Sequence, residues 1–233
     1  MTAAGGAISM LVGAVLLRLS LTGTHQRYVR VGMGPWLTIA GLVVLALGVA
    51  TLVRSLRAQR QGSGGGSEAD HHHDHGDRVG WLLLAPIAAL LLVAPPTLGS
   101  YGVDRGAAVD VRAGAPTFDP LPAGGEPAAM TLLEFNQRAL DHGGDSFDGQ
   151  SVQLTGFVAD AATPFRLARY QIACCAVDAA PVVVRVVGTV GASPVLDQWV
   201  TVTGTFTGLD DDDVPELAAT SIVEIPAPEE PYE

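Results

Sequence analysis

Two adjacent cysteines in the C-terminal half, Cys174 and Cys175, carry the most reactive side chains of the chain, and Asp178 follows them closely. Thiolates and carboxylates are ligands for Zn²⁺ and related ions, and His142 is a further candidate ligand. Neighbouring side chains in a regular strand point to opposite faces, so both cysteines can bind one ion only if the chain turns there. A disulfide between them is unfavourable, because adjacent Cα atoms lie about 3.8 Å apart whereas disulfides join Cα atoms about 4.4–6.8 Å apart.

Two other interpretations of the cysteine pair remain open. The thiols could be redox-active if Arg166 or Arg169 lowered a thiol pKa. They could instead be small apolar residues buried in the core, which residue chemistry alone slightly favours. The sequence contains no C-x-x-C, P-loop, G-x-S-x-G or H-E-x-x-H motif, and we therefore expect a protein that is not an enzyme.

A second group of candidate ligands lies in a polar loop over residues 61–78. After a flexible Gly/Ser-rich linker, imidazoles and carboxylates follow closely: His71, His72, His73, His75, Asp70, Asp74 and Asp77. This composition is typical of metal-binding tracts. A flexible tract cannot preorganise one geometry, so we expect weak, multi-site binding suited to buffering or sensing. A polar cytoplasmic loop without a metal role is the alternative.

The two halves of the chain differ in composition. The 233 residues carry a net charge of −11 but have a positive mean hydropathy, because long apolar runs fill residues 1–98 and most carboxylates lie in residues 99–233. This acidic balance argues against a nucleic-acid partner, whose phosphates require a basic surface. Two cysteines are too few for a disulfide framework.

Residues 1–98 predict a membrane domain with three helices, at about residues 3–21, 35–53 and 79–98. Each segment has close to the roughly 20 apolar residues that a bilayer core requires. The first lacks a preceding basic residue and a small-residue cleavage site, so we expect a retained helix. The second carries Gly41 and Gly48 on one face, which predicts either close packing against a partner helix or contact with lipid.

The distribution of arginines predicts the orientation. The loop between the second and third segments, with its flanks, holds one arginine more than the loop after the first segment. The positive-inside rule therefore places the histidine tract in the cytoplasm and the C-terminal domain outside it. We expect a multi-pass protein of the cell membrane, in contact with membrane lipid.

The rest of the chain predicts a spacer over residues 99–128 and a mainly-β domain over residues 129–233. Thr131 and Glu134 form a capping box at the start of a helix. Five short β-type runs follow, at residues 151–159, 165–175, 181–187, 199–207 and 217–225. This pattern favours a small five-stranded OB-like barrel with one preceding helix, with a small sandwich as the alternative. The four aspartates at residues 210–213 then form a solvated turn, since their spacing is not that of an EF-hand loop.

Several segments carry a resemblance to one bacterial family: residues 17–24, 28–30, 33–37, 95–100, 156–158, 169–178, 199–204 and 231–232. On these segments the chain resembles the YcgQ-like family, which is described as permease subunits. Residues 169–178, with the double cysteine, are the most specific of them. Val177 replaces the alanine of the family pattern and leaves Asp178 in place. The resemblance implies a multi-pass permease as partner. It also makes metal binding by the cysteines about as well supported as their burial as core residues.

The sequence and the resemblance together lead us to expect an accessory subunit of a bacterial membrane permease that handles or senses a metal ion such as zinc. Cys174, Cys175 and Asp178 are the expected ligands in the domain, and the histidine tract supplies others. Two other functions stay open: a metal-independent, membrane-anchored interaction module, and an envelope thiol redox protein.

Overall fold

The computed structural model describes residues 3–61, 97–105, 117–188 and 194–233. The chain forms two compact units. The first contains the N-terminal helices. The second contains residues 97–233 together with Arg27–Arg30, a short stretch that lies between the two N-terminal helices in the sequence.

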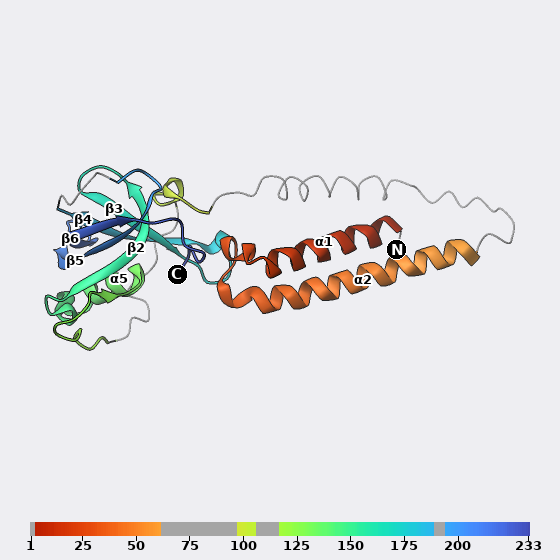
Figure 1. Ribbon diagram of the computed structural model, residues 1–233, viewed down its shortest axis with the longest axis horizontal. Helices are drawn as coiled ribbons and strands as arrows, with labels where there is room; N and C mark the ends of the chain where they lie inside the picture. The colour runs from red at the N-terminus through yellow and green to blue at the C-terminus, as the bar shows by residue number, and fades with distance from the viewer. Residues whose placement is uncertain (1–2, 62–96, 106–116, 189–193) are drawn as a thin grey trace. The chain divides into compact units, whose positions relative to one another are not determined.

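The first unit is a pair of helices packed side by side, α1 (Ala3–Leu21) and α2 (Gly34–Gln61) (Figure 1). Two short 3-10 turns, η1 (Thr24–Arg27) and η2 (Val31–Met33), lie between them in sequence. Glycines permit the close approach of the two backbones. A Cβ atom on Gly48 would lie 2.5 Å from the amide nitrogen of Met10, and one on Gly41 would lie 3.0 Å from Cγ of Leu17. The glycine face of α2 therefore packs against a partner helix, as the first of the two sequence interpretations states.

One helix in the described part of the chain, over residues 31–58 near the N-terminus, is long and apolar enough to cross a membrane. A shorter apolar helix covers Gly5–Leu21. Large apolar side chains of α2 are exposed, among them Trp36, Ile39, Leu42, Val43 and Leu47. A contiguous apolar surface of this kind is what lipid or another apolar helix covers. The third predicted helix (79–98, apart from its last two residues) and the histidine tract lie outside the described residues and stay predictions.

The second unit is a closed five-stranded barrel, as the sequence predicts. Its strands are β2 (Ser151–Asp160), β3 (Phe165–Gln171), β4 (Ala180–Val187), β5 (Trp199–Leu209) and β6 (Pro215–Glu224). They pair in the order β2-β3-β4-β6-β5, and β5 returns to β2 to close the sheet. Only the β4–β6 pair within this ring is parallel. This Greek-key closure is that of an OB-type barrel. A two-residue strand, β1 (Ala128–Ala129), adds to β2 in parallel.

A helix closes the barrel core. The helix α5 (Leu132–Leu140) begins where the capping box predicts, with the Thr131 hydroxyl accepting the N–H of Glu134 at 3.0 Å. Its apolar face, including the fully buried Leu132 and Phe135, packs on the side chains inside the barrel. The barrel strands alternate between buried and more exposed positions, which is the periodicity expected of a half-buried sheet.

Two details differ from the sequence prediction. Part of the predicted spacer contributes to the barrel domain, because Val103 and Leu121 are buried in its two apolar clusters. These isolated apolar residues lie among Gly, Pro and Asp and give no periodic signal. The second predicted strand also ends early: β3 stops at Gln171, and the chain turns before it reaches the cysteines.

The cap of α5 provides a test of the fold. Replacing Thr131 by Ala removes the acceptor of the Glu134 N–H, and we expect the free energy of unfolding to fall by about 1 kcal/mol. Thr131→Ser keeps the hydroxyl and should unfold close to the wild type. Urea unfolding of the detergent-solubilised chain measures both variants. Equal losses in the two variants would show that the cap does not stabilise the helix.

Candidate metal site

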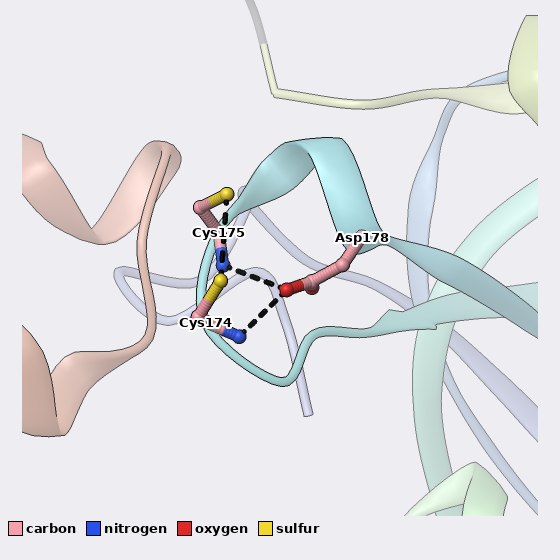
Figure 2. Close-up of side chains that lie close together, drawn as sticks. All are labelled: Cys174, Cys175 and Asp178. Atoms are coloured by element: carbon pink, nitrogen blue, oxygen red, sulfur yellow. Dashed lines mark hydrogen bonds between the residues drawn. The ribbon is translucent and has the colours of Figure 1, made fainter.

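The two cysteines lie in the loop between β3 and β4, which one carboxylate organises. Oδ1 of Asp178 accepts the N–H of Ala173 at 2.9 Å, and Oδ2 accepts the N–H groups of Cys174 at 2.9 Å and Cys175 at 3.3 Å. Figure 2 shows the carboxylate pointing at the backbone of the cysteine pair. Three consecutive amides are therefore held by one side chain, which fixes the turn that follows β3.

This turn brings the two thiols to the same side. The sulfur atoms of Cys174 and Cys175 lie 3.7 Å apart (Figure 2). Cys175 is extended and caps the short 3-10 helix η6 (Ala176–Asp178), with its sulfur accepting the N–H of Asp178. One ligand atom from each of Cys174, Cys175 and Asp178 lies within 4.8 Å of the others. The chain therefore turns at the cysteine pair, as the sequence analysis requires if both sulfurs are to bind one ion.

The exposure of these residues corrects one interpretation. Cys174 and Asp178 are exposed and Cys175 is half-buried, whereas the sequence slightly favours burial of the cysteines as apolar core residues. That interpretation is wrong because β3 ends at Gln171, so the cysteines belong to a surface loop. The last core residue before them is Ile172.

The loop shifts the pKa values of Asp178 and Cys174 in opposite directions. Hydrogen bonds from the Cys174 thiol and from the backbone lower the pKa of Asp178 to about 2, so its carboxylate is ionised at neutral pH. The hydrogen bond to Asp178, followed by that to Cys175, raises the pKa of the Cys174 thiol to about 11. Cys174 is therefore a protonated thiol at neutral pH, and a metal ion must displace its proton to bind the sulfur.

These findings give no support to a thiolate activated by arginine. Arg166 donates to the carboxylate of Asp104, with a shortest distance of 2.8 Å, and Arg169 donates to the carbonyl oxygen of Glu230 at 2.6 Å. The rise in the pKa of Cys174 is also opposite to the shift that a reactive thiol requires.

A second segment of the chain pairs with the cysteine loop. The N–H of Arg30 donates to the carbonyl oxygen of Cys174 at 3.1 Å, and the N–H of Ala176 donates to that of Tyr28 at 2.7 Å. These bonds form an antiparallel bridge between Val29 and Cys175. We call residues Arg27–Arg30 the connector, because they link α1 to α2 in sequence yet belong to the barrel unit. Sequence reasoning missed this pairing, because nearly 150 positions separate Val29 from Cys175.

His142, the other predicted ligand among the described residues, does not join the site. The side chain of His142 is exposed, lies 3.6 Å from Asp141, and is not part of the three-residue cluster. Within the described residues, Cys174, Cys175 and Asp178 are the one group of His, Cys, Asp and Glu side chains arranged to hold a metal. His71, His72, His73 and His75 lie outside those residues.

The ligand set fits a borderline metal. Two sulfur ligands and one carboxylate are suitable for Zn²⁺, which accepts both donor types. Two sulfurs each about 2.3 Å from a tetrahedral zinc ion would lie about 3.8 Å apart, close to the separation of the two thiols here. The cluster could therefore hold a metal with little movement of the sulfurs, and a fourth coordination position would stay open.

Comparison with known proteins finds two domain families that match the chain. Residues 6–105 match the DUF1980 N-terminal domain, and residues 136–233 match the DUF1980 C-terminal domain. The chain carries both domains of DUF1980. The C-terminal match contains the whole five-stranded barrel and the cysteine loop, and the N-terminal match contains most of α1, all of α2 and the connector. No curated protein and no solved structure matches the chain.

The bond between Cys174 and Asp178 can be tested through the titration of the thiol. In a Cys175→Ser background, alkylation of Cys174 should rise with pH with a midpoint above the ordinary thiol pKa, because the Asp178 carboxylate holds the thiol proton. Asp178→Asn removes the negative charge and should lower this midpoint by at least about one pH unit toward the ordinary thiol value. Asp211→Asn, in the β5–β6 turn, is the matched control. An unchanged midpoint in Asp178→Asn would contradict the pairing.

Proposed function

We propose that the protein is an accessory subunit of a bacterial membrane permease, and that its cysteine loop binds zinc on the extracytoplasmic side of the cell membrane. The observation that carries this proposal is the exposed cluster of Cys174, Cys175 and Asp178, whose ligand atoms lie within 4.8 Å of one another. A barrel domain presents this cluster, and the same chain contains a helix of membrane-spanning length. The resemblance to YcgQ-like permease subunits supports the transport role.

The openness of the cluster supports handling or sensing rather than a structural zinc site. Structural zinc ions have four protein ligands, whereas this loop supplies three on an exposed surface. A fourth position left to water permits exchange of the ion with a partner. The high pKa of Cys174 adds to this lability, because protons compete with the metal at neutral pH.

The connector supports an even number of membrane crossings between itself and the barrel, and an odd total if α1 also crosses. The connector lies between α1 and α2 in sequence and hydrogen-bonds to the barrel domain, so connector and barrel occupy the same side of a membrane. If α1 and α2 both cross the bilayer, the chain leaves α2 on the opposite side. It must then cross once more before Thr97, and the apolar residues 79–98 are the sequence suited to that crossing. The histidine tract then faces the cytoplasm.

The exposed apolar face of α2 supports a partner within the membrane. Its side chains, such as Trp36 and Leu47, are largely exposed in the described helix pair, and lipid or a helix of the permease would cover them. The same face also favours the second candidate function, a metal-independent interaction module. That function predicts that the subunit and permease co-purify after both cysteines are replaced.

Zinc binding tests the first function. We expect the full-length protein, with its four tract histidines replaced by Gln, to bind one zinc ion per chain in competition with a chelating dye. Cys174→Ala with Cys175→Ala should weaken binding at least tenfold, whereas Thr131→Ser should bind like its parent. Because the Cys174 proton is displaced, affinity should rise with pH, by roughly tenfold per pH unit for that proton. Equal binding by the double variant would contradict the proposed site.

The topology can be tested by labelling intact cells. A membrane-impermeant maleimide, applied after a zinc chelator, should label Cys174 and Cys175 without permeabilisation. In a Cys174→Ser, Cys175→Ser background, a cysteine introduced as Ser63→Cys in the loop before the histidine tract should be labelled only after permeabilisation. Labelling of both sites from the same side would exclude the proposed arrangement of three crossings.

A further inference from the structure

We infer that zinc binding at the cysteine loop stabilises the bridge to the connector, so that the occupancy of the site acts on the segment joining α1 to α2. This inference rests on the proposed zinc site and goes beyond it. It names the backbone contact through which that site would regulate the membrane part of the chain.

The bridge and the ligands share the same few residues. The carbonyl oxygen of Cys174 accepts from Arg30, and the N–H of Ala176 donates to Tyr28, so the bridge flanks Cys175 on both sides. A metal bound to both sulfurs restricts the torsions of Cys174 and Cys175. The bridging groups belong to the same backbone stretch. With zinc bound, this stretch therefore loses less conformational entropy when the bridge forms.

The connector is also held at its other end. The hydroxyl of Tyr232 donates to the carbonyl oxygen of Arg27 at 2.9 Å, and it accepts the N–H of Leu98 at 3.4 Å. Tyr232 itself is half-buried and pairs with Tyr170 of β3 through a parallel bridge. The barrel thus fixes Arg27 independently of the cysteines. A change at the cysteine loop is therefore taken up within Tyr28–Arg30, and only three residues separate Arg30 from the first residue of α2, Gly34.

The coupling must be reciprocal. If zinc stabilises the bridge, then the bridge stabilises bound zinc by the same factor. Loss of the Arg30 N–H should weaken zinc binding even though Arg30 supplies no ligand. Arg30→Pro removes this N–H, whereas Arg30→Ala removes only the side chain and keeps the amide. The two variants therefore separate the backbone bond from the charge of the guanidinium.

The test uses the full-length protein in detergent with the tract histidines replaced by Gln. Hydrogen exchange is followed with and without zinc for peptides covering residues 27–31 and 172–179. We expect zinc to slow exchange in both peptides of the parent protein, and in neither peptide of the Cys174→Ala, Cys175→Ala variant. Arg30→Pro should bind zinc at least about fivefold more weakly than its parent, and Arg30→Ala within about twofold.

The outcomes distinguish the inference from the proposed function. Zinc binding with unchanged exchange in the connector peptide would overturn the inference and leave the zinc site intact. The absence of zinc binding in the parent would overturn both. The exchange measurement on the parent protein needs no connector variant, so a folding defect in Arg30→Pro would not prevent a decision.

Discussion

The carboxylate of Asp178 holds the candidate site together. It accepts three consecutive amides, from Ala173 to Cys175, and so converts the end of β3 into a tight turn. Without that turn, the alternation of side chains along a strand would direct the two cysteines to opposite faces. The hydrogen bond from the Cys174 thiol, together with those from the amides, stabilises the charged form of this carboxylate and lowers the pKa of Asp178 to about 2. The geometry and the electrostatics of the loop thus have one cause.

The barrel provides the rigid support for this loop. β3 and β4 leave the loop as adjacent antiparallel strands, paired from Phe165 with Val186 to Gln171 with Ala180. Their buried side chains, including Leu167 and Val184, pack in the core that α5 closes. Both ends of the loop are therefore fixed by a packed sheet, while the cysteines themselves stay exposed. Accessible ligands on a rigid framework are suited to a metal that must be bound and released.

The parts of the fold set by local sequence could be predicted. Alternating residues gave the five strands, and Thr131 with Glu134 gave the start of α5, because caps and strand periodicity depend on neighbours within a few positions. The OB-like barrel could be predicted because five short strands with turns between them are typical of that fold.

What the sequence could not predict depends on distant contacts or on a local turn. The bridge from Val29 to Cys175 joins segments that no periodicity relates, and Val103 and Leu121 enter the core from an irregular stretch. The exposure of Cys174 depends on β3 ending at Gln171, although the β-type residues continue beyond it. Asp178 was named as a ligand from its chemistry. Its role in holding three amides became visible only with the turn.

We propose that two thiolates and a carboxylate of one surface loop bind the same zinc ion. X-ray absorption at the zinc edge, on the full-length protein with the tract histidines replaced and one equivalent of zinc, measures the ligands directly. We expect about two sulfur neighbours at roughly 2.3 Å together with oxygen neighbours at roughly 2.0–2.2 Å. A first shell made only of oxygen and nitrogen would contradict it.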